Sequence, residues 1–165
     1  LIVEEGKNHN LSHCGSHAMD TMRMESGFLH WGHDISPEEN QYEAGLSFAI
    51  SYKKEIDFIG KQSLSKIKDN KKNKRFIMLS LIDSKPGMPL LLHEEPIFLK
   101  DEIIGKTTSG NYSFNYSKNL SFGYVKSEYS NEELSKMSLY IEVARKKYLV
   151  RVEPNPLKDK KARFL

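Results

Sequence analysis

The sequence has very little cysteine and no long apolar run. Cys14 is its one cysteine, so no disulfide can form within the chain. No apolar stretch approaches the roughly 18 residues that a membrane-spanning helix needs, and no charged-then-apolar leader opens the sequence. These absences predict a reducing, cytoplasmic setting without a membrane partner. Because the sequence opens on Leu1 rather than methionine, a targeting signal further upstream would not be visible.

A strong excess of one charge is also absent. The 25 Lys and Arg residues and the 22 Asp and Glu residues leave a formal net charge of +3. A nucleic-acid-binding surface needs basic residues clustered on one face, and the even spread here predicts no nucleic-acid partner. With 38% apolar and 28% charged residues, the composition is typical of a globular protein with one domain or two small ones.

One polar stretch divides the chain. Residues 68–75 read Lys-Asp-Asn-Lys-Lys-Asn-Lys-Arg, a run with no apolar face to bury. It predicts a domain boundary, with one domain over residues 1–70 and a second over residues 75–165. We favour a solvated linker over an anion-binding patch as its interpretation. Internal repeats and other low-complexity tracts are absent from the sequence.

The first domain contains mainly helical patterns. Ala18 and Met22 keep the helical period, which predicts a helix over about residues 16–26 that stops at Gly27. We expect four further elements: the cut end of a helix over 1–7, a short helix or turn at 36–39, a strand at 46–50 and a second helix over 57–67.

The second domain switches to short strands separated by turns. They are expected at 76–82, 96–99, 103–108, 121–126, 139–144 and 148–152. Two charged triplets, 100–102 and 145–147, lie where hairpin turns are expected. Six strands at this spacing indicate a small closed barrel or a sandwich, and we favour the six-stranded antiparallel barrel. The fold class of the whole chain is therefore predicted as α+β.

Two groups of residues suggest chemistry that their spacing does not support. Side chains of the metal-ligand type occur at His13, Cys14, His17, His30, His33 and Asp34, but not at the spacing of a recognised zinc site, so no metal is expected. Cys14 also has no assigned base, which favours a half-buried structural thiol over a nucleophile. The run Gly105–Gly110 lacks the Lys-Ser/Thr ending of a phosphate-binding loop, and a strand ending in a glycine turn explains it.

The densest chemistry lies in residues 23–35, which read Arg-Met-Glu-Ser-Gly-Phe-Leu-His-Trp-Gly-His-Asp-Ile. The guanidinium of Arg23 and the carboxylate of Glu25 could hydrogen-bond the edge of a flat heterocycle, and Trp31 offers a ring for stacking. The alternative is a helix end at which Arg23 pairs with a carboxylate and Trp31 fills core. The residues alone leave both interpretations open.

This stretch resembles the aminomethyltransferase family, the glycine cleavage T-protein and its relatives. The resemblance continues through residues 34–46 and 57–61, and then through Gly105–Ser113 and Phe122–Val125 in the same order. The His-Trp-Gly-His-Asp wording and the ending from Glu153 through Arg163 are most similar to the folate-binding halves of dimethylglycine and sarcosine dehydrogenases.

The resemblance implies the C-terminal half of a tetrahydrofolate-dependent aminomethyltransferase. Residues 1–70 would complete the folate-binding domain, and residues 75–165 would form the C-terminal β-barrel. Arg23, Trp31 and Glu25 would line the tetrahydrofolate cavity, with Trp31 at a position where the family often has tyrosine. The complete protein would transfer a one-carbon unit from an amine donor to tetrahydrofolate, in glycine cleavage or in dimethylglycine or sarcosine demethylation.

The same resemblance places the catalytic aspartate outside this sequence. The family supplies it from the N-terminal part of the domain, so we expect no catalytic residue here and no activity from the fragment alone. The expected partners are folate, the amine donor and the missing N-terminal half, with or without a flavin domain. The alternative is a non-catalytic folate-fold assembly protein related to iron–sulfur cluster maintenance factors, whose cysteine motif is not present around Cys14. A generic β-barrel interaction domain would leave the ordered motifs unexplained.

Overall fold

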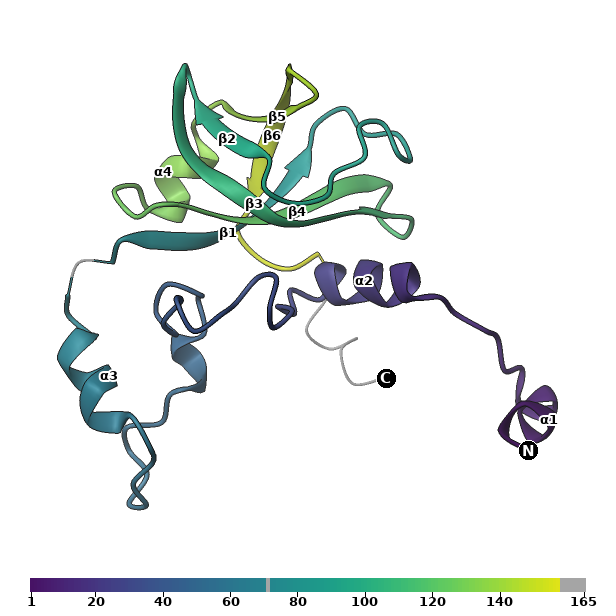
Figure 1. Cartoon of the computed structure of the whole chain (residues 1–165), viewed down its shortest axis with the longest axis horizontal. Coiled ribbons are helices and arrows are strands. Elements are labelled where there is room, and N and C mark those ends of the chain that lie inside the picture. The colour runs from purple at the N-terminus through teal and green to yellow at the C-terminus, as the bar shows by residue number, and fades with distance from the viewer. Residues whose placement is uncertain (71, 158–165) are drawn as a thin grey trace.

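The computed structural model describes residues 1–70 and 72–157. A β-barrel forms one layer, and the N-terminal helices and loops extend beneath it (Figure 1). The helices are α1 (Ile2–Gly6), a 3-10 turn (Lys7–His9), α2 (Ser16–Glu25), a second 3-10 turn (Ser47–Ala49), α3 (Lys61–Ile67) and α4 (Asn131–Ser135). The strands are β1 (Lys74–Leu81), β2 (Pro96–Leu99), β3 (Glu102–Ser113), β4 (Lys118–Lys126), β5 (Leu139–Val143) and β6 (Lys146–Glu153). No helix in this part of the chain is long and apolar enough to cross a membrane.

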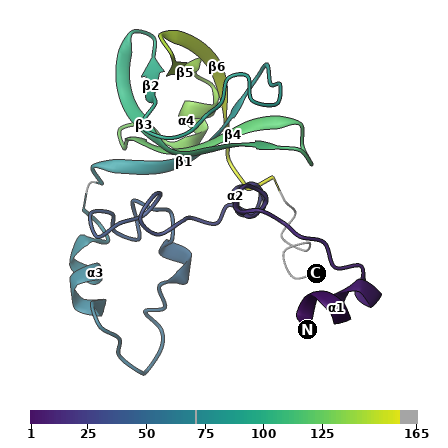
Figure 2. The same cartoon turned by 45° about the vertical axis from the view of Figure 1, so that its right-hand side comes forward.

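The predicted six-stranded antiparallel barrel is confirmed. Its strands follow the order β1-β4-β3-β2-β5-β6, and β6 pairs with β1 to close the barrel. Alternating apolar residues from all six strands fill the interior, and Leu134 of α4 packs against them. Helix α4 lies against the barrel (Figure 2). The largest fully buried members of this core include Leu79, Ile97, Leu139 and Ile141. Barrel closure leaves no open sheet edge, which suits a strand-rich unit of this size.

The glycine turn expected at Gly105–Gly110 is wrong, because β3 runs unbroken through both residues. A Cβ atom on Gly105 would lie 2.0 Å from the Tyr124 carbonyl oxygen, and one on Gly110 would lie 2.5 Å from the Leu91 Cβ. The glycines therefore allow close approach of the neighbouring backbone rather than a turn. The second hairpin turn also lies earlier than expected, at Ala144 and Arg145, where both φ angles are positive.

The first region follows its prediction in part. The helix stopping at Gly27 is confirmed as α2, whereas the strand at 46–50 is wrong: the chain forms a 3-10 turn there and Phe48 is 84% exposed. Apolar and polar residues alternate in that segment, but none of the described strands lies alongside to pair with it. The helix predicted over 57–67 begins only at Lys61, because Gly60 has a φ of 87° that an α-helix excludes.

The first region buries almost no apolar side chains of its own. Before β1, Met24 and Ala44 are the buried apolar residues among those that the structure describes. Met24 packs beneath the barrel against Met78, Leu120 and Phe122. The barrel therefore provides the surface on which α2 is held.

We predict that Gly105→Ala strongly destabilises the barrel. The added methyl would meet backbone atoms of β4, which cannot move without breaking the ladder, so the free energy of unfolding should fall by about 3 kcal/mol. Urea denaturation measures the loss. Gly15→Ala is the control, because a Cβ atom there has no neighbour within 4 Å, and a similar loss in both variants would contradict the steric explanation.

Candidate functional site

Helix α2 places the residues of the motif against the barrel. It ends at Glu25 with Ser26 as its C-cap, and Gly27 follows with a φ of 72°, a left-handed conformation that commonly ends helices. The amide of Phe28 then donates to the carbonyl of Arg23 at 2.8 Å, which turns the chain back across β3. A Cβ atom on Gly27 would lie 2.5 Å from Pro156, so a larger residue would push the C-terminal segment away.

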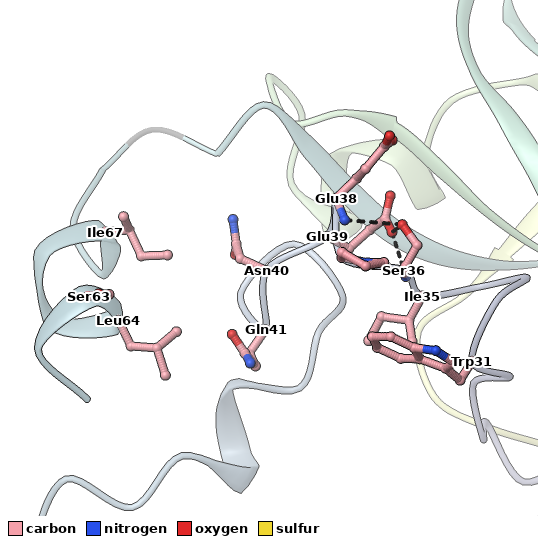
Figure 3. Close-up of a pocket in the computed structure, with 11 residues that line it drawn as sticks. Trp31, Ile35, Ser36, Glu38, Glu39, Asn40, Gln41, Ser63, Leu64 and Ile67 are labelled. Carbon is pink, nitrogen blue, oxygen red and sulfur yellow. Dashed lines mark hydrogen bonds between the residues drawn. The ribbon is translucent and has the colours of Figure 1, made fainter. Parts of the chain in front are cut away.

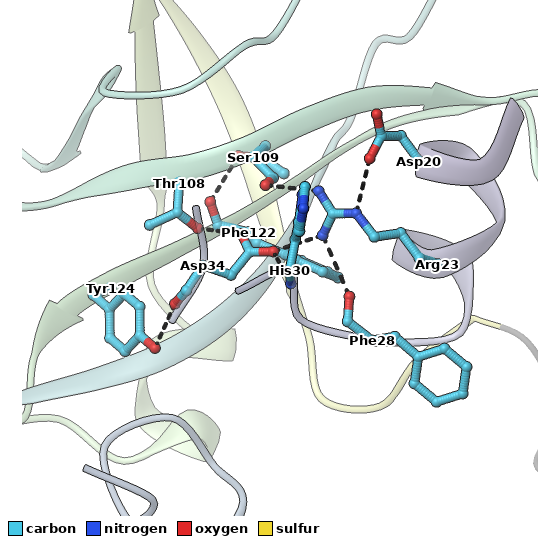
Figure 4. Close-up of polar contacts among 10 residues, drawn as sticks. Asp20, Arg23, Phe28, His30, Asp34, Thr108, Ser109, Phe122 and Tyr124 are labelled. Carbon is cyan, nitrogen blue, oxygen red and sulfur yellow. Dashed lines mark hydrogen bonds and ion pairs between the residues drawn. The ribbon is translucent and has the colours of Figure 1, made fainter. Parts of the chain in front are cut away.

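Arg23 is the centre of a polar network between α2, the following loop and the barrel (Figure 4). Its Nε donates to Asp20 at 3.0 Å, its Nη1 donates to Asp34 at 2.6 Å, and its Nη2 donates to the hydroxyl of Ser109 at 2.9 Å. Nη1 also donates to the carbonyl of Phe28 at 3.3 Å. The carboxylates that pair with Arg23 are therefore those of two aspartates, Asp20 and Asp34.

Asp34 receives hydrogen bonds from three parts of the chain. Its side chain is fully buried and accepts from Arg23 at 2.6 Å, from the His30 amide at 2.9 Å and from the Thr108 hydroxyl at 2.6 Å. Its backbone carbonyl accepts from the Tyr124 hydroxyl at 2.8 Å. A buried carboxylate is stable only when it is paired and hydrogen-bonded, and Asp34 meets both conditions.

A β-bulge in β3 directs two successive side chains toward this network. The register between β3 and β4 shifts between Thr107 and Ser109, so Thr108 is the extra residue. Neighbouring side chains of a regular strand point to opposite faces, but Thr108 and Ser109 both bond the network. The hydroxyl of Thr107 instead bonds Glu95.

Glu25 lies apart from Arg23 and holds the β3–β4 hairpin. It is buried, and its two carboxylate oxygens accept from the Ser113 hydroxyl at 2.5 Å and the Asn115 amide at 2.9 Å. Both donors are neutral. The sequence placed Glu25 in a ligand cavity, whereas the structure shows it bonded to the barrel.

Trp31 is the exposed member of the predicted set, with 66% of its surface accessible. Its backbone pairs with Ile35, and the amide of Gly32 donates to the Ile35 carbonyl at 2.8 Å. The ring lines a cavity of about 460 Å³ whose opposite wall is formed by Leu64 and Ile67 of α3 (Figure 3). Trp31 also lines a more apolar cavity of about 640 Å³ beneath the barrel.

Glu39 is one of two glutamates that line the first cavity, the other being Glu38. Burial alone would raise the pKa of Glu39, but hydrogen bonds from Lys74 and Ser36 outweigh burial and lower the pKa below the ordinary value of 4.5. Its Oε2 accepts from the Ser36 hydroxyl at 2.6 Å and the Ser36 amide at 2.8 Å, which forms the turn predicted at 36–39. Burial also raises the pKa of Tyr124, with nearby carboxylates adding to the effect, so its hydroxyl stays protonated as the donor to Asp34.

The structure does not place the three predicted residues around one cavity. Neither cavity lined by Trp31 is lined by Arg23 or Glu25, and their roles in folate binding stay a prediction. Sequence reasoning missed Thr108, Ser109 and Tyr124, and considered Asp34 only as a metal ligand. In the described ranges no three His, Cys, Asp or Glu side chains are grouped to hold a metal ion. Cys14 is exposed rather than half-buried.

Comparison with known proteins gives the same result for both parts of the chain. Residues 1–54 match the family model described as the GCVT N-terminal domain, and residues 74–159 match the glycine cleavage T-protein C-terminal barrel domain. An aminomethyltransferase of Symbiobacterium thermophilum is 36% identical over 124 residues, which cover 75% of this chain and 32% of that protein. The mitochondrial dimethylglycine dehydrogenase of Rattus norvegicus is 33% identical over 158 residues, covering 94% and 18%.

A solved structure shares the fold. The aminomethyltransferase T of the glycine cleavage system from Bartonella henselae superposes with a TM-score of 0.73 at 21% identity, over 86% of this chain and 38% of that chain. The chain therefore spans about a third of the aminomethyltransferases it matches and about a fifth of the dehydrogenase. The end of the sequence that resembles the dehydrogenases runs from Glu153 through Arg163. Beyond residue 157 this segment lies outside the described residues.

We predict that Glu39→Gln removes part of the pH dependence of stability. The pKa of Glu39 is lowered in the folded chain, so ionised Glu39 stabilises the fold above about pH 4.5, and this stabilisation is lost as the pH falls through the folded-state pKa. The variant should be less stable by about 1 kcal/mol at pH 7, with the difference vanishing in acid. Urea titrations from pH 3 to pH 7 test this. Glu38→Gln, at an exposed neighbouring position, should be indistinguishable from wild type at both ends.

Proposed function

The chain belongs to the glycine cleavage T-protein family, and from that premise we propose that it is the C-terminal part of a tetrahydrofolate-dependent aminomethyltransferase. The complete protein would transfer a one-carbon unit from an amine donor to tetrahydrofolate. The donor belongs to glycine cleavage or to dimethylglycine or sarcosine demethylation, since relatives of both kinds align over most of the chain. The single exposed cysteine supports a reducing, cytoplasmic setting.

The observation that carries the proposal is the position of Trp31. A tryptophan ring that is 66% exposed, on a turn fixed by a buried carboxylate, presents a flat apolar face between two cavities. Such a face suits stacking against the planar ring system of a folate. Trp31 is therefore the direct contact in the proposed site.

Arg23 and Glu25 have weaker support as folate contacts. The side chain of Arg23 is 15% exposed and already bonds Asp20, Asp34 and Ser109, and both oxygens of Glu25 are bonded to barrel residues. Contact with folate would require these bonds to be shared or exchanged. We retain both residues as predicted contacts, to be tested in the complete protein.

We propose domains over residues 1–70 and 75–165, joined by the polar stretch at 68–75. The catalytic carboxylate would come from the N-terminal part of the first domain, which makes that part a required partner, with or without a flavin domain. An iron–sulfur assembly role gains no support from the lone Cys14. The coding sequence upstream distinguishes the candidates, because an aspartate segment or a flavin-binding glycine motif would support transfer chemistry.

We predict that this chain alone is catalytically silent and that the complete protein is active. Incubation with tetrahydrofolate and an aminomethyl donor should give no folate adduct above the uncatalysed rate for residues 1–165, because the proposed base lies elsewhere. Product formation is followed by chromatography of the folates. Turnover by the chain alone would show that the reacting groups lie within it, and an inactive complete protein would reject the proposed function.

We predict that Arg23→Ala separates the two roles considered for this residue. A lost charge-assisted bond to folate would weaken binding in the complete protein by roughly ten- to a hundredfold, with the fold retained. If the role of Arg23 is purely structural, its replacement by alanine leaves Asp34 buried without its cation. The melting temperature then falls, while the affinity of the folded molecules for folate is unchanged. Folate titration and thermal melting on the same samples distinguish these results. Unchanged affinity with a large fall in melting temperature would rule out the ligand role.

A further inference from the structure

We propose that Asp34 and the bulged Thr108 are positioning residues that set the orientation of the Trp31 turn from the barrel. The inference concerns polar contacts of the β-barrel, whose side chains from β1, β4 and β6 also line the second of the two cavities beside Trp31. It deepens the proposed function and rests on it only for the identity of the ligand that Trp31 contacts. The positioning itself is a property of this chain.

The bulge in β3 directs the side chain of Thr108 toward Asp34. Thr108 is the extra residue in the β3–β4 ladder, and its hydroxyl donates to Oδ1 of Asp34 at 2.6 Å. Without the shift, the strand alternation would turn the side chain of residue 108 away from the face that Ser109 occupies. Bulges re-aim single side chains in this way. In this strand the hydroxyl that the bulge redirects is that of Thr108, and it bonds the carboxylate of Asp34. Among the described residues it is the side chain of β3 that bonds this carboxylate directly.

Asp34 is bonded in two ways to His30, at the start of the Trp31 turn. Oδ2 of Asp34 accepts from the His30 amide at 2.9 Å, and the Asp34 amide donates back to the His30 carbonyl at 2.8 Å. These two bonds close the turn on which Trp31 and Gly32 lie. The Asp34 side chain is fully buried, so a rotation that broke its bond from the His30 amide would leave that amide without its acceptor and Oδ2 with Arg23 as its remaining donor.

The two carboxylate oxygens of Asp34 accept from different donors. Oδ1 is bonded by Thr108, while Oδ2 is shared by Arg23 and His30. Removal of the Thr108 hydroxyl leaves the ion pair with Arg23 in place but frees the carboxylate to rotate. The orientation of the turn then depends on Thr108, whereas the cohesion of α2 with the loop depends on Arg23.

The chain offers a matched control one residue away. Thr107 is fully buried, and its hydroxyl bonds Glu95 instead of Asp34 in the Trp31 turn. Thr107→Val and Thr108→Val therefore make the same chemical change at neighbouring positions of one strand, and each removes a partly buried hydroxyl bond to a carboxylate. Both variants should lower the melting temperature. Thr108→Val alone should release the turn.

The single tryptophan makes the release measurable in this chain without a label. Time-resolved fluorescence anisotropy should show about a twofold larger amplitude of fast motion of Trp31 in Thr108→Val than in wild type. Thr107→Val and Thr108→Ser, which keeps the hydroxyl, should match wild type. Thr108→Ala removes the hydroxyl without placing a methyl beside the carboxylate, and it serves as the second variant if Thr108→Val does not fold. Equal anisotropy in the Thr108 and Thr107 variants would overturn the proposal.

Titration with tetrahydrofolate in the complete protein separates this inference from the proposed function. Thr108→Val should raise the dissociation constant by roughly three- to tenfold, the loss expected for one bond of this kind, and Thr107→Val should not. A wild-type protein that does not bind tetrahydrofolate, together with a Trp31 turn released by Thr108→Val, rejects the function and supports the positioning. A wild-type protein that binds, with equal affinity in both valine variants, overturns the positioning and keeps the function.

Discussion

The buried carboxylate of Asp34 is the constraint on which the arrangement of the N-terminal region depends. An ionised group that is removed from water must be matched by donors, and here the donors come from α2, from the turn and from the barrel. Each donor belongs to a different segment of the sequence, so satisfying one charge fixes three segments relative to one another. No apolar contact in the region has the same directional requirement.

Much of the fold could be predicted from the sequence because its patterns are local. Strand alternation after residue 75 identified all six strands, and a glycine after a helical period identified the end of α2. Two of the errors share a cause. Alternation at 46–50 and the glycines of 105–110 were interpreted without their neighbours, and the outcome at each depended on whether another strand lay alongside.

The candidate site could be predicted less well, because its contacts join residues that lie far apart in the sequence. The motif at 23–35 contains Arg23 and Asp34, yet nothing in it shows that Asp34 meets Thr108, 74 residues away. The bulge that permits this contact has no sequence signature at Thr108, which reads as one of several strand residues. A single sequence therefore shows which polar and aromatic groups the motif contains, but not which residues elsewhere in the chain they contact.

The distribution of apolar surface explains why the barrel matters to the Trp31 turn, beyond the side chains that it contributes to the second cavity. Large apolar side chains before β1 are mostly exposed, Trp31, Phe28 and Phe48 among them, while Met24 and Ala44 are buried. A region with so little core cannot fix a loop by packing, so its geometry must come from directional bonds to a rigid neighbour. The closed barrel provides that neighbour, and the polar contacts of Thr108, Ser109 and Tyr124 transmit its rigidity. Loss of barrel packing would therefore also release the Trp31 turn.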